Sequence, residues 1–242
     1  MASTAVFTDK IEAKDFEKMP QEYKDLFTKV MTIQADSELG GPHLYVEKWV
    51  LAAPTAEDQM MLAKTAAEEI DHHRKFVKIL ADLNIDVSYQ LRNRSKDRIL
   101  EIFREPLETW ADMGCFGTFI DRVGGYHLED FAECSYLPVA RIIPQILKEE
   151  KQHIAHGIQI LTRLCQSPEG KAQVQKSLDH MYPRCLDMFG VTGSKRSEQY
   201  LHWGIKKRTN EQARKQYMAE AQGLIKQFGL VEPDPLKDRR FV

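Results

Sequence analysis

The sequence has no long apolar run, no signal-peptide core and no excess of charge of either sign. No stretch approaches the ~20 consecutive apolar residues that a membrane-spanning helix needs, and segment 1–19 lacks the apolar centre of a signal peptide. The 36 acidic and 34 basic side chains give a formal net charge of −2, which argues against a nucleic-acid-binding surface. We therefore expect a cytoplasmic protein without a nucleic-acid or membrane partner.

Cysteine is scarce and unpaired in the sequence. The four cysteines, Cys115, Cys134, Cys165 and Cys185, lie far apart and form no Cys-x-x-Cys motif. This spacing argues against a disulfide framework and against a cysteine-bound zinc site, and it is typical of a protein from a reducing compartment.

Segments that alternate polar and apolar residues with a period of two are also scarce. Apolar residues recur at spacings of three and four instead, which predicts helices throughout. We expect an all-α protein with a single domain built on a four-helix bundle. Its expected parts are an N-terminal arm (1–19), the bundle (20–166), additional C-terminal helices (167–230) and a tail (231–242).

Local signals suggest where several helices begin and end. Pro20 is expected in the first turn of the first long helix, and the GGPH segment (40–43) is expected to interrupt it. Thr55 is the expected N-cap of the second long helix, with Asp58 three residues later, and Asn84 is expected to end it.

The third and fourth long segments contain residues that disfavour helices. Glycines at positions 114, 117, 124 and 125 each cost about 1 kcal/mol relative to alanine in a helix, so they suggest close helix packing or a local distortion. Pro144 is expected to kink the fourth helix or to mark its true start.

A Glu-Glu-x-x-His cluster occurs twice, in AAEEIDHHRKF and in LKEEKQHIAHG. On a helix, residues three apart project from one face, so Glu69 with His72 and Glu150 with His153 can each bind one metal ion. A single such pair is usually a solvated helix face. Two copies on helices with apolar faces favour a metal site.

Di-metal carboxylate bundles also need one acid from each of the other two helices. Glu38 lies 31 residues before the glutamate of the first pair, and Asp121 lies 29 residues before that of the second. Glu129 and Glu133 are competitors for the second position, but their separations of 21 and 17 residues leave little chain for two half-helices and a loop. The spacing therefore selects Glu38 and Asp121.

Carboxylates combined with two imidazoles suit iron or manganese better than zinc. Two reduced irons with open coordination positions can react with O₂, either to oxygenate a substrate or to oxidise iron for storage. His73 and His156 are not counted as ligands and are expected to make outer contacts or to support the ligands. No catalytic residue beyond the metal centre is predicted.

The chain resembles the catalytic-subunit family of bacterial phenylacetyl-CoA epoxidase, whose members are ferritin-like di-iron monooxygenases. The resemblance is carried by MPQEYKDLF, SELGG, ETWADMG, KEEKQH, IKKRTNEQARKQY and PDPL, and it extends over most of the chain. The ligand pattern of that family falls on the same six residues: Glu38, Glu69, His72, Asp121, Glu150 and His153.

The resemblance implies a ferritin-like fold, O₂ as co-substrate, electrons from a separate reductase, and an aromatic substrate, perhaps as a CoA thioester, that becomes an epoxide. A second helical subunit or a homodimer is an expected partner. The candidate substrate-binding residues are Lys29, Lys64, Phe116, Phe119, Ile120 and His127. A ferritin-like iron-storage protein and a non-catalytic subunit of an oxygenase are the alternatives.

Overall fold

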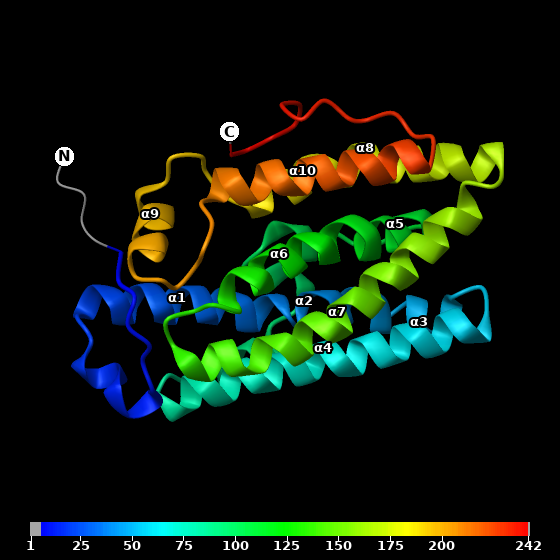
Figure 1. Ribbon diagram of the computed structural model, residues 1–242. Helices are drawn as coiled ribbons and strands as arrows, with labels where there is room; N and C mark the ends of the chain where they lie inside the picture. The colour runs from blue at the N-terminus through cyan, green and yellow to red at the C-terminus, as the bar shows by residue number, and fades with distance from the viewer. Residues whose placement is uncertain (1–5, 242) are drawn as a thin grey trace. The chain divides into compact units, whose positions relative to one another are not determined.

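The computed structural model describes residues 6–241, and the regular structure in this range is helical (Figure 1). Strand-like pairing within it is confined to an isolated bridge between Ile11 and Tyr136. No helix of the described chain combines the length and the apolar character that crossing a bilayer would require. The prediction of an all-α protein is confirmed.

The described chain divides into two compact units, each made of segments that are far apart in the sequence. The first contains the chain up to Leu107, Phe131–Ile146 and Gln199–Lys207; the second contains Glu108–Asp130, Leu147–Glu198 and the chain from Arg208 onward. Helix α7 (Leu137–Leu164) begins in the first unit and continues in the second. The single domain expected from the sequence stays a prediction.

In the first unit, α4 (Ala56–Asp82) is the longest helix and packs against α1 (Gln21–Ser37). The short helices α2 (Gly40–Val46) and α3 (Trp49–Ala52) also pack on α4 (Figure 1). Short 3₁₀ helices complete this unit: η1 (Ala13–Lys18), η2 (Ser88–Arg92), η3 (Ser95–Asp97) and η4 (Glu101–Arg104).

The expected ends of α4 are confirmed. The Thr55 side chain accepts a hydrogen bond from the Asp58 backbone N–H at 3.1 Å, which satisfies one of the free donors at the start of the helix. At the other end, Asn84 has a φ of 60°, a left-handed conformation that stops the helix and that asparagine tolerates better than most residues.

The GGPH segment begins a helix instead of interrupting one, so that prediction is wrong. Helix α1 ends before Glu38 and Leu39, and α2 then starts at Gly40. Pro42 lies in the first turn of α2, where a missing N–H costs little. A Cβ on Gly40 would lie 2.3 Å from the Phe103 ring, so glycine here permits the close approach of an aromatic side chain.

In the second unit, α5 (Trp110–Cys115) and the following π-helix η5 (Phe116–Ile120) pack on α8 (Pro168–Met188). The Ser177 hydroxyl of α8 donates to Asp112 of α5 at 2.6 Å. The remaining helices are α6 (Asp121–Phe131), the later part of α7, part of α9 (Lys195–His202) and α10 (Asn210–Gln227). Helix α9 was not expected from the sequence.

The glycines of the third segment serve two purposes, as the sequence suggested. Cβ atoms on Gly114 and Gly117 would lie 2.6 Å and 3.2 Å from their nearest neighbours on α7, so these two permit close helix packing. The local distortion is the π-helix that contains Gly117. Pro144 lies inside α7 and does not mark its start.

Gly124 offers a first prediction, because a Cβ there would meet no other atom within 4 Å. Gly124→Ala should raise the free energy of unfolding by about 0.5–1 kcal/mol, since alanine has the higher helix propensity and no clash offsets it. Urea unfolding followed by circular dichroism measures this change. A loss of stability would contradict the open surroundings of this position.

Candidate metal centre

Three buried side chains of the first unit bring potential metal ligands together. Glu38 follows the last turn of α1, and Glu69 and His72 lie on α4; their exposed fractions are 4%, 8% and 0%. The His72 Nδ1 atom is 3.5 Å from Glu38 Oε2 and 3.8 Å from Glu69 Oε2. Two donors that are each about 2.1 Å from one ion lie no more than about 4.2 Å apart. The three residues are therefore spaced to share an ion.

Two hydrogen bonds hold this group in place. Gln34, one turn before Glu38 on α1, donates from Nε2 to Glu38 Oε1 at 2.6 Å. The other carboxylate oxygen, Oε2, is the one near His72. His73 donates from Nδ1 to the Ala35 carbonyl at 2.7 Å, so it joins α4 to α1. Burial lowers the pKa of His73, which favours the neutral ring.

A buried ion pair anchors the end of α1 that precedes Glu38. Arg98 donates from Nη1 to Asp36 Oδ1 at 2.8 Å, and neither side chain is more than 1% exposed. The Ile99 backbone N–H donates to Asp36 Oδ2 at 2.8 Å, and Arg98 Nη2 donates to the Gln90 carbonyl at 3.2 Å. The connection after α4 is thereby tied to the helix end that presents Glu38.

The second unit contains a matching pair on α7. Glu150 and His153 have exposed fractions of 4% and 3%, and Glu150 Oε2 is 3.6 Å from His153 Nδ1. The same donor atoms, a carboxylate Oε2 and an imidazole Nδ1, approach each other in both units. Within each helix this follows from the three-residue spacing.

Close contacts within the second unit define how the α5–α6 segment lies along α7. The pairs are Gly114 with Ile160, Gly117 with Gly157, and Gly125 with Ile154. Because one number falls as the other rises, the two segments run antiparallel. This register places Asp121 at the level of His153. Asp121 is half-buried and begins α6 directly after the π-helix, and π-turns of this kind are frequent at functional sites.

The competing acids are engaged elsewhere. Glu129 is exposed and forms an ion pair with Arg208 at 3.2 Å, and Glu133 is exposed and forms one with Lys207 at 3.4 Å. These contacts argue for Asp121 over both alternatives. The six-residue ligand set itself stays a prediction.

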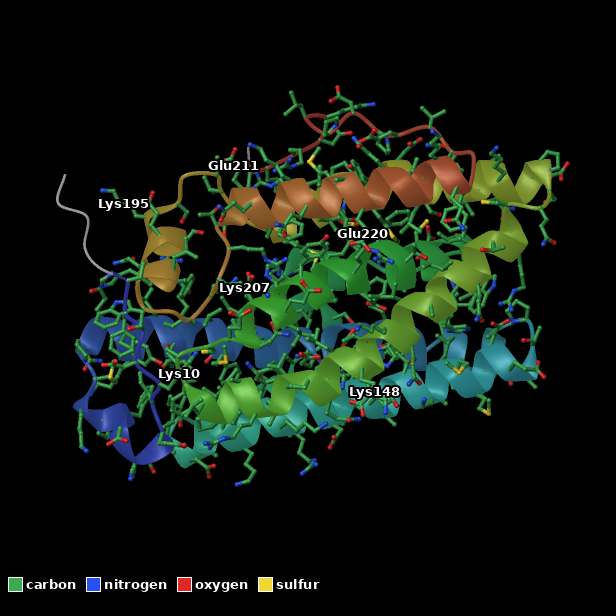
Figure 2. The ribbon with its side chains drawn as sticks, viewed as in Figure 1. Lys10, Lys148, Lys195, Lys207, Glu211 and Glu220 are labelled. Carbon is green, nitrogen blue, oxygen red and sulfur yellow. The ribbon has the colours of Figure 1, made fainter. Side chains whose placement is uncertain are left out.

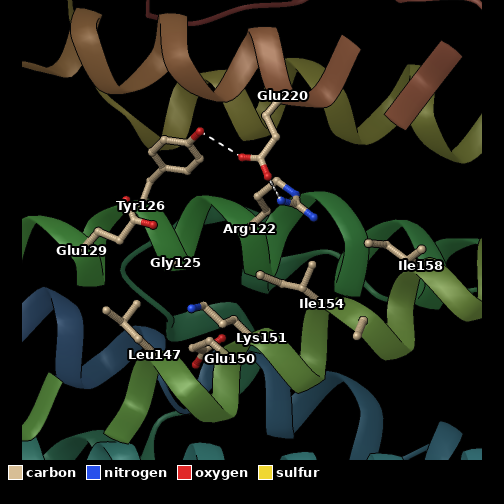
Figure 3. A pocket seen from close by; sticks show the side chains of 11 residues that line it. Arg122, Gly125, Tyr126, Glu129, Leu147, Glu150, Lys151, Ile154, Ile158 and Glu220 are labelled. Carbon is tan, nitrogen blue, oxygen red and sulfur yellow. Dashed lines mark hydrogen bonds and ion pairs between the residues drawn. The ribbon is translucent and has the colours of Figure 1, made fainter. Parts of the chain in front are cut away.

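The second unit also has a cavity of about 360 Å³ beside Glu150. It is lined by Arg122, Gly125, Tyr126, Glu129, Leu147, Glu150, Lys151, Ile154, Ala155, Ile158 and Glu220 (Figure 3). Glu220 projects from α10 (Figure 2), and its carboxylate accepts hydrogen bonds from the Tyr126 hydroxyl at 2.9 Å and from Arg122. Burial and the Glu220 hydrogen bond raise the pKa of Tyr126 to about 12, so its hydroxyl keeps its proton.

The predicted substrate-binding residues do not line this cavity. Lys29 and Lys64 lie on other helices, and Lys64 pairs with Glu68 at 3.4 Å. Phe116, Phe119 and Ile120 are buried, and the His127 ring lies 5.5 Å from that of Phe189. Their roles stay predictions.

Several residues of both sites were missed from the sequence. Gln34 could have been found, because it lies one turn before Glu38 on the same helix. The contact of Arg122 with Glu220 spans 98 residues and leaves no local pattern.

One protein family and two named proteins resemble the chain in sequence. A family model described as "Phenylacetic acid catabolic protein" matches residues 2–240. One of the proteins belongs to the 1,2-phenylacetyl-CoA epoxidase of Escherichia coli K12; it is 27% identical over 230 residues, which cover 93% of this chain and 74% of that one. Benzoyl-CoA oxygenase component B of Aromatoleum evansii is 27% identical over 197 residues, which cover 78% of this chain but only 41% of that protein.

A variant of an R2-like ligand-binding oxidase, with an aerobically reconstituted Mn/Fe cofactor, shares the fold at a TM-score of 0.55 and 17% identity, covering 94% of this chain and 85% of that one. This likeness confirms the predicted ferritin-like fold class, and the named relatives confirm the prediction of an oxidoreductase. Because the family model spans nearly the whole sequence, the chain belongs to the phenylacetic acid catabolic protein family.

Proposed function

We propose that this protein is an oxygenase in which a pair of metal ions, iron first and manganese second, activates O₂ for insertion into an aromatic acyl substrate. The observation that carries the proposal is the repeated pair of a buried glutamate and a buried histidine, with the same donor atoms 3.8 Å apart in the first unit and 3.6 Å apart in the second. Each unit would contribute the ligands of one ion.

The donor set suits such ions. Glu38, Glu69 and His72 would hold one ion, and Asp121, Glu150 and His153 would hold the other. Buried carboxylates are costly without a compensating positive charge, and Glu38 and Glu69 place two of them near each other. Carboxylate oxygens with an imidazole favour iron or manganese over softer metals.

The protein's contribution is to bind, orient and exclude water. When bound, the metal pair supplies the activation of O₂. Gln34 holds Glu38 Oε1 so that Oε2 is left for an ion. Binding through Nδ1 requires each histidine to be neutral with its proton on Nε2. One oxygen atom would enter the aromatic ring as an epoxide, and the other would leave as water with two electrons and two protons.

The relatives suggest the substrate and the partners. Their names specify phenylacetyl-CoA and benzoyl-CoA, so we take an aromatic CoA thioester as the substrate of this chain. Those names also describe parts of larger, multi-protein systems. A separate reductase would supply the electrons, and a second helical protein is the expected structural partner.

Metal analysis and isotope labelling test this function. The protein expressed with iron should retain about two irons per chain. After chemical reduction, a single exposure to ¹⁸O₂ should put one ¹⁸O atom into phenylacetyl-CoA, detected by mass spectrometry. A protein that binds no metal would contradict the proposal, and growth of an iron mineral would instead identify a storage protein.

Gln34 supplies a further prediction. Gln34→Leu should weaken metal binding by about 10–100-fold, because the hydrogen bond that orients Glu38 is lost while the side-chain volume is similar. Competition with a chelator measures the affinity. Gln21→Leu, an exposed change on the same helix, is the control and should leave it unchanged. Equal affinities for the two variants would show that Gln34 does not orient a ligand.

A further inference from the structure

The cavity beside Glu150 has one apolar wall and a gap opposite it. Leu147, Ile154 and Ile158 line it from one side of α7, and Gly125 of α6 lies across from them (Figure 3). A Cβ on Gly125 would be 3.9 Å from Ile154 Cδ1 and would meet nothing closer. Glycine disfavours a helix interior, so this position leaves room beside the apolar wall that most other residues would occupy.

Two cationic side chains at this cavity have hydrogen-bonding capacity that the described residues do not use. Arg122 donates from Nε to the Thr118 carbonyl at 3.3 Å and from Nη1 to Glu220, which leaves Nη2 without a partner in the described chain. Lys151 is exposed at the cavity and forms no ion pair within the same residues. An occupant with an oxygen acceptor would satisfy both.

The acidic groups at the cavity are already engaged. Glu220 is held by Arg122 and by the Tyr126 hydroxyl. Glu129 is paired with Arg208 at 3.2 Å, and Glu150 is a proposed metal ligand. The charge still available to an occupant is therefore positive, beside an apolar wall.

We propose that this cavity binds the acyl end of an aromatic substrate, with the ring between Gly125 and the α7 side chains and the carbonyl oxygen facing Arg122 Nη2 and Lys151. The assignment rests on the proposed function, because Glu150 serves both the cavity and the metal centre. A volume of about 360 Å³ is near the lower end for small-molecule sites. The cavity therefore holds the acyl group and leaves a nucleotide-bearing tail outside.

A pair of neighbouring glycines tests the cavity. Binding of phenylacetate, phenylacetyl-CoA and CoA to the full-length, metal-loaded protein is measured by calorimetry without reductant. Gly125→Phe should fill the space and weaken binding of both aryl probes by about tenfold or more, whereas Gly124→Phe, which lies outside the cavity lining, should change it by less than about twofold. Circular dichroism confirms that both variants are folded. Equal affinities in the two variants, or no aryl binding to the wild type, would overturn the assignment.

A pair of lysines on α7 tests the polar contact. Lys151→Ala should weaken binding of phenylacetyl-CoA by about fivefold or more, because a cation facing the acyl oxygen is lost. Lys148→Ala removes a lysine outside the lining (Figure 2) and should leave the affinity unchanged. Equal losses in both variants would show that the lysine effect is a general charge effect and would overturn the role of Lys151.

The probes also separate the sources of the acyl group and the two levels of the proposal. Comparable affinities for phenylacetate and phenylacetyl-CoA support recognition of the acyl end alone, and binding of CoA alone with the same affinity as its thioester would overturn it. Iron content and ¹⁸O incorporation are measured on the same preparations. If both are present but Gly125→Phe binds normally, the cavity assignment is wrong and the oxygenase stands. If aryl binding depends on Gly125 but no metal is retained, the oxygenase is wrong and the cavity stands.

Discussion

Glu150→Ala or His153→Ala should remove about half or more of the iron bound to the protein while leaving its helices folded. Each change deletes one of two donor groups that approach within 3.6 Å of each other on α7. An ion that loses a ligand of this kind binds far more weakly, whereas an alanine on a long helix preserves its backbone. Elemental analysis gives the iron content, and far-ultraviolet circular dichroism gives the helix content.

The neighbouring Gln152 provides the control, because it is exposed on the same helix turn. Gln152→Ala should keep the full iron content. The corresponding changes on α4, Glu69→Ala and His72→Ala, should each match the α7 variants, and combining one change from each helix should remove nearly all of the metal. Unchanged iron in the α7 variants would defeat the proposed centre.

Gly157→Ala should lower the free energy of unfolding by about 2–3 kcal/mol, which is the upper part of the usual range for overpacking. A Cβ at this position would lie 2.5 Å from the Gly117 carbonyl carbon and 2.6 Å from the Thr118 nitrogen. Both are backbone atoms, so no side-chain rotation can relieve the clash. The contact also fixes the register that brings Asp121 to the level of His153, so iron retention should fall as well.

Urea unfolding and elemental analysis measure the two effects on the same protein. Gly124→Ala is the matched control, because the same substitution in open surroundings should stabilise the protein. If Gly157→Ala were as stable as the wild type, α7 would not pack against η5 as closely as the structure shows.

Local rules predicted many of the element boundaries. Thr55 caps α4 and Asn84 ends it, because a hydroxyl that accepts a backbone N–H and a residue that tolerates positive φ act within one turn of the chain. The same rules failed for GGPH, where Gly40 serves the Phe103 ring. That partner lies far along the chain, and no local pattern announces it.

The sequence by itself determined the helical class, the family and the two glutamate–histidine pairs, because residues three apart on a helix share a face whatever surrounds them. Only the tertiary structure decided what supports and borders those pairs: the Gly117–Gly157 contact, the ion pair of Arg98 with Asp36, and the cavity that Arg122 and Glu220 border. These contacts join segments tens of residues apart, and they depend on how helices pack within each unit, which periodicity along the chain does not encode.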